Sequence, residues 1–295
     1  MRWVAIVALA TMAGCNLVFG LDPPAGDDDG GGDVDADTRP DGPPGDRDSD
    51  GIGDFVDNCP ADANTDQHDE DEDATGDVCD NCPHMANEGQ SDAADGDGVG
   101  DICDPNRRPG GDRLLLFEPF STLGSRWTPA LGTWAPSSDS VVGGQSGGTH
   151  LLASVDTYEH AQVVASVRFL AVQTAGQLGV YFALDRTNPS IPFGYLCLIQ
   201  YTPLTSTTGD GRAQVNKFLA AGGATVLVDL GVPALTLGDT YTIVANASAD
   251  EQNCVLALPN LTVPMRALDG EYRRGAVGIR ARDATVAVDW LVIYE

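Results

Sequence analysis

The sequence predicts a mostly β protein in two unlike parts, an acidic N-terminal part without an apolar core and a C-terminal antiparallel β-sandwich. Residues 22–104 hold 28 acidic and 2 basic residues, a balance of −26 in a chain whose net charge is −28. Residues 113–295 hold 15 acidic and 11 basic residues, a balance of −4, in short β-rich runs without a helical period. Because so acidic a chain would approach phosphates against its own field, we expect no nucleic-acid partner.

Residues 1–14 have the pattern of a secretory signal peptide. Arg2 precedes an apolar run over residues 3–10, which is too short to span a bilayer. Residues 12–15 read Met-Ala-Gly-Cys, and this tetrad resembles the bacterial lipobox. The resemblance implies cleavage before Cys15, lipidation of Cys15, and an anchor in the lipid bilayer of a bacterial cell envelope.

The residue after the cysteine bears on the destination. Asn16 stands there instead of Asp, so the Gram-negative sorting rule that accompanies the lipobox implies the outer membrane and leaves surface exposure open. The alternative is ordinary secretion, with Cys15 buried or paired. Residues 15–45 are rich in Gly, Pro and Asp and have too few apolar residues to bury a core. We expect them to form an acidic, extended tether.

Residues 46–104 contain three copies of one aspartate-rich loop, which start at residues 46, 69 and 93. The spacing is that of an EF-hand-type calcium loop of twelve residues, with acidic side chains at positions 1, 3, 5, 9 and 12 and a glycine at position 6. The first copy consists of Asp46, Asp48, Asp50, Gly51, Asp54 and Asp57. The second consists of Asp69, Asp71, Asp73, Asp77 and Asp80, with Ala74 in place of the glycine. The third consists of Asp95, Asp97, Gly98, Asp101 and Asp104, with Ala93 at position 1 and Asp92 displaced by one residue.

These side chains predict calcium as the bound ion. Hard carboxylate ligands without histidine or thiol favour calcium over zinc or copper. The backbone carbonyls of Ile52, Thr75 and Val99 fall at position 7, where such loops supply a main-chain oxygen. The alternative is a solvated acidic linker, which three copies in register make the weaker interpretation. We expect the first loop to bind most tightly, and Ala74 to strain the second turn.

Cysteines recur at fixed places around the loops. The segments DNCP at residues 57–60, GDVCDNCP at 76–83 and GDICD at 100–104 accompany NTDQ at 64–67 and NEGQ at 87–90. No amphipathic helix flanks the loops, so paired EF-hands are not expected. The pattern closely resembles thrombospondin type 3 repeats. The resemblance implies a calcium-wrapped stalk stapled by two disulfides, Cys59 with Cys79 and Cys82 with Cys103. Zinc at the CDNC segment is the weaker alternative, because the cysteines lie among aspartate loops in an exported chain.

After a linker at residues 105–112, the sandwich is expected over residues 113–295. Cys197 and Cys254 are the pair left for this region, and export makes an oxidising compartment the expected one. Eleven runs are strand candidates: 113–120, 151–155, 161–171, 178–184, 194–201, 213–220, 225–230, 240–247, 254–258, 276–281 and 285–294. In the last run, alternation predicts one core face made of Val286, Val288, Trp290, Val292 and Tyr294.

Three segments of this region resemble the concanavalin A-like jelly-roll superfamily, especially its lamin-G-like modules. They are FEPFSTLGSRWTPALGTWAP at residues 117–136, GQLGVYFALDR at 176–186 and GAVGIRARDATVAVDWLVIYE at 275–295. The resemblance implies a jelly roll, a fold that hosts lectins, glycosidases and structural modules, so it does not name a function.

The sandwich shows little catalytic chemistry. Retaining glycosidases of this fold place two glutamates on one strand, whereas Glu118 and Glu159 stand alone. Trp127, Trp134 and Tyr181 are candidates for stacking on sugar rings, although core positions are the favoured interpretation. We therefore expect the sandwich to bind a glycan or a protein partner, in adhesion. The alternatives are a glycoside-acting enzyme and a structural envelope component without a ligand.

Overall fold

The computed structural model describes residues 45–108, 111–185, 187, 192–248 and 250–295. The predicted signal peptide, Cys15 and the tether up to residue 44 lie outside the described residues. The described residues all belong to one compact unit. The described part of the chain contains strands and turns but no helix, and so no helix that could cross a membrane.

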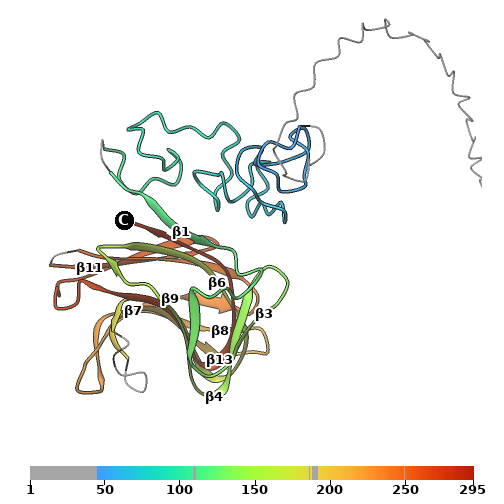
Figure 1. Ribbon diagram of the computed structural model, residues 1–295. Helices are drawn as coiled ribbons and strands as arrows, with labels where there is room; N and C mark the ends of the chain where they lie inside the picture. The colour runs from blue at the N-terminus through green and yellow to red at the C-terminus, as the bar shows by residue number, and fades with distance from the viewer. Residues whose placement is uncertain (1–44, 109–110, 186, 188–191, 249) are drawn as a thin grey trace, which may run out of the picture. The chain divides into compact units, whose positions relative to one another are not determined.

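The sandwich is built from antiparallel strands, which confirms the predicted fold class (Figure 1). The described strands are β1 (Leu114–Glu118), β2 (Trp127–Leu131), β3 (Trp134–Pro136), β4 (Val141–Ser154), β5 (Tyr158–Glu159), β6 (Gln162–Asp185), β7 (Phe193–Pro203), β8 (Thr208–Phe218), β9 (Ala224–Thr236), β10 (Thr240–Ala247), β11 (Gln252–Leu258), β12 (Leu261–Ala267) and β13 (Arg274–Tyr294).

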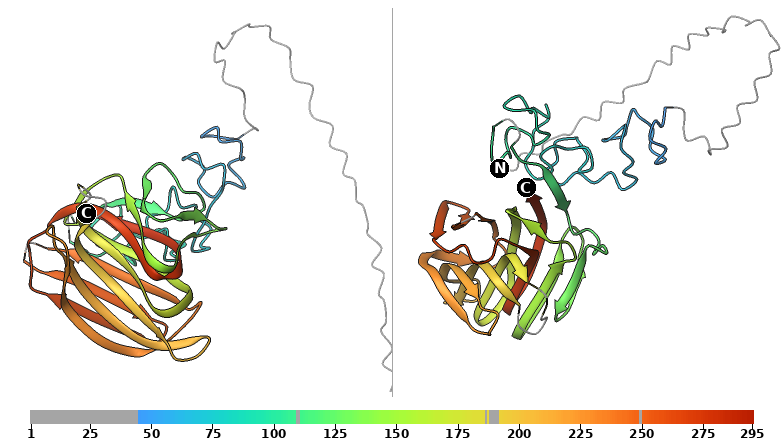
Figure 2. Two further views of the ribbon diagram at one scale, coloured as in Figure 1. Left: turned by 90° about the horizontal axis from the view of Figure 1, so that it is seen from below. Right: turned by 60° about the vertical axis from the view of Figure 1, so that its left-hand side comes forward.

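Three long strands, β4, β6 and β13, run through both layers of the sandwich (Figure 2). The first half of β6 pairs with β10, and its second half pairs with β7. β11 and β12 extend the first layer beyond β10, and β8 and β9 extend the second layer beyond β7. β13 pairs with β6 along both halves and so belongs to both layers.

The bends of β4 and β13 between the two layers coincide. The register of their pairing shifts between Arg282 and Ala284, and Asp283 in between adopts a positive φ of 52°. On β4, Gly147 and Gly148 have φ values of 85° and 152°, which favour glycine. The Gly148 amide donates a hydrogen bond to Asp283 Oδ1 at 3.0 Å. Two glycines and a paired aspartate thus turn both strands at one place.

The main core lies between the layers. Val163, Val167 and Phe169 of the first half of β6 reach it, as do Val180 and Phe182 of the second half. This alternation is the period-2 pattern of a strand with one buried face. A disulfide between Cys197 of β7 and Cys254 of β11 links the two layers through this core.

The prediction for the closing strand was wrong in one respect. Val286 and Val288 lie in the main core, but Trp290, Val292 and Tyr294 lie on the opposite face. A register shift between Val288 and Trp290 is the cause, because one extra residue reverses every later side chain. Leu291 and Ile293 take the core positions instead.

The repeat segment is held together by disulfides and side-chain amides. Cys59 is bonded to Cys79 and Cys82 to Cys103, the pairing that the resemblance implied. In the first repeat, Asn64 Nδ2 donates to Asn58 Oδ1 at 2.7 Å, and in the second Asn87 Nδ2 donates to Asn81 Oδ1 at 2.8 Å. The described residues of this segment include no strand. Side-chain hydrogen bonds therefore hold its turns together, where strand pairing holds the sandwich.

One small apolar cluster joins the repeats to the outer face of the first layer. Val99 of the third loop is fully buried, at 0% exposure, and packs with Val164, Val292 and Tyr294. His84 lies nearby, with its ring centroid 4.8 Å from that of Trp290. The side chains that the closing bulge turns outward are therefore covered by the repeat segment.

Candidate functional site

Each loop brings three carboxylates together, so that one oxygen of each lies within 4.8 Å of the others. The groups are Asp46, Asp48 and Asp50 in the first loop, Asp69, Asp71 and Asp73 in the second, and Asp92, Asp95 and Asp97 in the third. These side chains stand at positions 1, 3 and 5, and in the third loop the displaced Asp92 fills position 1.

A shared hydrogen bond explains why Asp92 can take this position. The amide of Gly51 donates to Asp46 Oδ2 at 3.1 Å, and the amide of Ala74 donates to Asp69 Oδ2 at 3.0 Å. In the third loop the amide of Gly98 donates to Asp92 Oδ2 at 2.8 Å. The loop therefore accommodates the extra residue between Asp92 and Asp95, and the position 6 amide still donates to the first carboxylate of the loop.

The carboxylates at position 9 lie outside the three groups and bind backbone amides. Asp54 Oδ1 accepts from the Arg47 amide at 2.8 Å, Asp77 Oδ1 from Glu70 at 2.9 Å, and Asp101 Oδ1 from Ala94 at 3.0 Å. Asp77 Oδ2 also lies 2.7 Å from His68 Nδ1. These side chains close their own loops, so a role as ligand would fall to an oxygen left over or to a bound water.

The position 7 residues fix the carboxylates at position 5. The amides of Ile52, Thr75 and Val99 donate to the Oδ1 atoms of the aspartates two residues before them, at 2.8, 2.8 and 2.9 Å. Such Asx turns orient the loop. The use of their carbonyl oxygens as ligands stays a prediction.

At position 12, one carboxylate oxygen is bound by the protein and the other is left for a ligand. Gln67 Nε2 donates to Asp57 Oδ1 at 2.8 Å, and Gln90 Nε2 donates to Asp80 Oδ1 at 2.9 Å. In the third loop the Asn106 amide donates to Asp104 Oδ1 at 2.6 Å. The glutamines of the NTDQ and NEGQ segments thus orient the carboxylates of their own repeats.

Buried oxygens without partners show that these loops fit a divalent cation. Among the described residues, the carboxylate oxygens that are buried and unpaired in this segment are Asp46 Oδ1, Asp48 Oδ2, Asp57 Oδ2, Asp71 Oδ2, both of Asp95, Asp104 Oδ2 and Asp112 Oδ2. Burial without a partner is costly for a carboxylate, and a hard cation removes the cost. Burial and the neighbouring Asp80 and Asp73 carboxylates raise the pKa of Asp71 to about 6.

Asp112 is a candidate ligand that the sequence analysis missed. Its amide donates to Asp97 Oδ2 at 2.8 Å, in the way that the amides of Asn64 and Asn87 donate to Asp50 Oδ2 at 2.9 Å and Asp73 Oδ2 at 2.7 Å. Burial and then Asp104 raise the pKa of Asp112. Its spacing from the third loop, one residue longer than in the other repeats, was the available signal. The predicted linker therefore completes the third repeat.

A second candidate site lies on the outer face of the second layer of the sandwich. A cavity of about 280 Å³ opens there, lined by Leu131, Thr149, Tyr181, Pro192, Phe218 and Arg280 among others. Tyr181 and Phe218 meet edge to face, with ring centroids 5.5 Å apart. Burial raises the pKa of Tyr181 to about 12.

The three aromatic residues predicted as candidate sugar contacts lie in two different apolar clusters. Trp127 and Trp134 are in the main core, and Trp127 Nε1 donates to Glu118 Oε2 at 3.0 Å. Tyr181 packs in the separate cluster on the outer face of the second layer. Glu118 is half-buried, and burial raises its pKa, but its carboxylate holds a core tryptophan in place.

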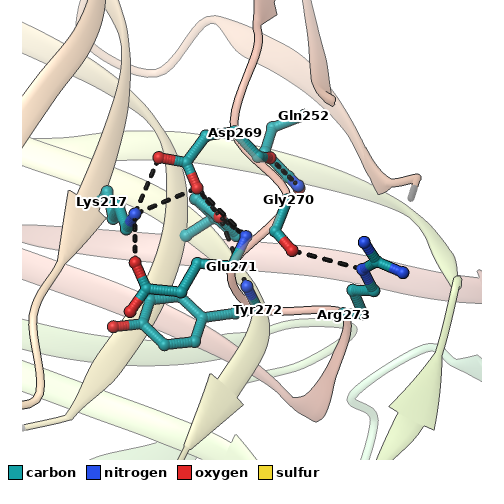
Figure 3. A network of polar contacts seen from close by, with 8 residues as sticks. Lys217, Gln252, Asp269, Gly270, Glu271, Tyr272 and Arg273 are labelled. Atoms are coloured by element: carbon teal, nitrogen blue, oxygen red, sulfur yellow. Dashed lines mark hydrogen bonds and ion pairs between the residues drawn. The ribbon is translucent and has the colours of Figure 1, made fainter. Parts of the chain in front are cut away.

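A third cluster surrounds Lys217 (Figure 3). Its ammonium donates to Asp269 Oδ2 at 2.7 Å and contacts Glu271, while the Tyr195 hydroxyl donates to Asp269 Oδ1. Burial acts against the charge of Asp269, yet the Lys217 and Tyr195 hydrogen bonds hold its pKa below the usual value. Lys217 of β8 contacts both carboxylates, and these contacts tie the loop after β12 to β8.

Comparison with known proteins matches part of the repeat segment to a family and finds solved structures similar to the chain. Residues 67–90 match the thrombospondin type 3 repeat family. No curated protein matches the sequence. Among solved structures, the chain is similar to the carbohydrate-binding module CBM66 from Bacillus subtilis, at 20% identity and a TM-score of 0.46, over 56% of this chain and 92% of that chain.

Two further structures are similar at the same level. One is the CBM2 module of the evolved Dit protein of Lactobacillus casei BL23 phage J-1, at 8% identity and a TM-score of 0.46, over 62% of this chain and 95% of that chain. The other is a β-glucanase from Bacillus licheniformis, at 10% identity and a TM-score of 0.42, over 60% of this chain and 96% of that chain. These likenesses concern the fold alone.

Proposed function

We propose that this chain is a lipid-anchored cell-envelope protein in which calcium-binding repeats carry a glycan-binding β-sandwich, in adhesion. The observation that carries the calcium part is the set of buried, unpaired carboxylate oxygens in the three loops. A cation would supply charge compensation there, while Gln67, Gln90 and the backbone amides orient the carboxylates. Cys15 would be the lipidated residue, and the outer membrane the destination.

The glycan part of the proposal is supported by the cavity on the second layer. Sugars present apolar ring faces beside hydroxyl groups, and they bind where aromatic side chains meet a few polar groups. Phe218 supplies the exposed aromatic surface, and Tyr181, itself buried at 1% exposure, packs against its edge. Gln177 and Gln200 lie on neighbouring strands in register, with Gln177 Nε2 donating to Gln200 Oε1 at 3.3 Å. Amides in this arrangement can both donate to and accept from hydroxyl groups.

The same face favours binding over glycoside cleavage. Cleavage needs two carboxylates on either side of the scissile bond. The described residues that line the cavity include no Asp or Glu. Asp229 of β9 is bound by Gln214 Nε2 at 3.1 Å and by the guanidinium of Arg212. A glycoside-acting enzyme is therefore the second candidate.

Calcium titration of the full chain tests the metal part. We expect uptake with dissociation constants of about 10⁻⁴ to 10⁻³ M, the range of extracellular modules, with the first loop tightest. Asp50→Ala should remove the first-loop site, whereas Asp210→Asn, at an exposed position of the sandwich, should change nothing. No heat of binding, or an Asp50→Ala chain that titrates as the parent does, contradicts the proposal.

A glycan array in calcium, repeated in chelator, tests the sandwich. We expect binding that Tyr181→Ala and Gln177→Ala both weaken. An array without binding contradicts a glycan ligand, and measurable glycoside turnover favours the enzyme. Intact-mass measurement of the membrane fraction tests the anchor, since a mature chain that does not begin at an acylated Cys15 contradicts it.

A further inference from the structure

We infer that the cavity on the second layer binds the anionic substituent of an acidic sugar, with Arg280 as the residue that selects it. The inference rests on the proposed glycan binding and names the chemical class of the ligand. It stands on the surroundings of one buried guanidinium.

Arg280 is buried, with only 6% of its surface exposed, and lines the cavity. Its Nη1 donates to Gln177 Oε1 at 2.9 Å, and its guanidinium carbon lies 5.3 Å from the ring centroid of Phe218. No carboxylate among the described residues forms an ion pair with it. Its direct partners, an amide and an aromatic ring, carry no negative charge, and Asp283 acts on it only beyond ion-pair distance while pairing with Arg282.

Four other arginines of the sandwich each form an ion pair with a carboxylate. Arg168 pairs with Asp289, Arg212 with Asp229, Arg266 with Glu251 and Arg282 with Asp283. All four are more exposed than Arg280. Arg280, the least exposed of these five arginines, is thus the one without a carboxylate partner among the described residues.

Burial of an unpaired charge is costly, and arginine does not escape it by losing its proton at neutral pH. Burial does lower the pKa of Arg280, which has the same physical cause. An anionic group that enters the cavity gains a charged, forked donor that has already lost its water. A neutral sugar gains only the aromatic surface, so the site discriminates by charge.

The size and lining of the cavity suit one sugar unit. The cavity volume of about 280 Å³ lies just below the range of about 300–1,000 Å³ typical of small-ligand sites. Tyr181, Phe218, Leu131 and Pro192 give it a largely apolar wall. Such a wall accommodates a ring face, while the anionic group reaches Arg280. The shared chemistry is an oxyanion on a pyranose, which a uronate or a sulfate ester can provide.

Binding by the full-length, disulfide-bonded chain in calcium tests this inference. The probes are oligogalacturonate and its methyl ester, a sulfated galactan oligosaccharide and its desulfated form, and oligoglutamate as a non-sugar polyanion. We expect at least one acidic oligosaccharide to bind about tenfold or more tightly than its neutral counterpart, which is the effect of one charged hydrogen-bonded contact. The arm that binds identifies the substituent as carboxylate or sulfate.

Variants then assign the effect to Arg280. Arg280→Gln should abolish the preference for the acidic form, and Arg280→Lys should keep part of it without the forked geometry. The control is Arg266→Gln, which removes an exposed, paired arginine on β12 and should keep the full preference. Each acidic oligosaccharide and its neutral counterpart are also compared on the wild-type chain. The inference can therefore be decided even if a variant fails to fold.

Equal affinity for acidic and neutral forms overturns the inference and leaves glycan binding standing. Equal or tighter binding of oligoglutamate overturns it in favour of an acidic protein partner. The absence of binding to any oligosaccharide overturns both the inference and the glycan-binding proposal.

Discussion

Ala74 occupies the turn position at which the other two loops have glycine. Its φ is +76°, close to the +97° of Gly51 and of Gly98, so an L-residue sits in the left-handed region. This is the strained second turn that the sequence predicts. The conformation persists because the Ala74 amide donates to Asp69.

Ala74→Gly should therefore stabilise the calcium-bound second repeat by about 1 kcal/mol, because it removes left-handed strain. Calcium titration and thermal unfolding in calcium are the measurements. Gly51→Ala is the matched control and should cost the first loop a similar amount. Equal calcium affinity of the Ala74→Gly and parent chains would refute the assignment of strain.

Asp112→Asn should weaken the third site about tenfold, because it removes a negative charge and replaces one carboxylate oxygen by an NH2 group, while the backbone hydrogen bond to Asp97 remains. Titration with calcium checks this, and Asp210→Asn is the control for the loss of one charge. A third site with unchanged affinity would show that Asp112 only closes the repeat.

Spacing predicts the grouped aspartates because their relation to the ion is local in sequence. Asp112 and Arg280 escape such reasoning for different reasons. Asp112 acts across 15 residues from Asp97, through a backbone contact that no local pattern encodes. Arg280 is defined by missing partners, and only the assembled sheet shows which side chains surround it.

At the scale of elements, alternation predicts most strands but not their register. The run 161–171 was expected to end where β6 in fact continues to Asp185 and crosses into the other layer. The side chains of the closing strand change face at a bulge. Apolar residues occur on both faces of this strand, so the sequence pattern does not reveal the bulge. Runs that are apolar on both sides carry no period that could fix the register.

The loop between β12 and β13 is an element held by charge. Lys217→Met should lower the free energy of unfolding by about 2–4 kcal/mol, because it leaves a partly buried Asp269 carboxylate without its cation. Denaturant unfolding is the measurement. Lys217→Met combined with Asp269→Asn should recover part of the loss, and a double variant no more stable than the single one would contradict this account.

At the scale of the whole molecule, the repeat segment and the sandwich meet at His84 and Val99. Burial lowers the pKa of His84 to about 4, and its Nδ1 is buried without a partner among the described residues. The folded chain then binds fewer protons than the unfolded chain between about pH 6.5 and 4. Stability from this residue is present above that window and is lost as the pH falls through it.

His84→Phe should remove this dependence and keep the packing on Trp290. Relative to the variant, the parent chain should lose up to about 1.4 kcal/mol of unfolding free energy per pH unit within the window. Unfolding of both chains is measured in saturating calcium at pH 7, 6, 5 and 4. The difference in unfolding free energy between the two chains isolates His84, because the carboxylates titrate alike in both. Parallel pH profiles would contradict the buried state of His84.

We expect calcium to order the repeats, while the sandwich folds on its own apolar core. Few apolar side chains support residues 46–104, against a backbone entropy cost of about 1–2 kcal/mol per residue. Hydrogen exchange of the full chain, with calcium and with chelator, measures both parts at once. Amides of residues 46–104 should lose protection in chelator, while those of β4, β6 and β13 keep theirs. Repeats that stay protected without calcium, or core strands that lose protection with them, would contradict this expectation.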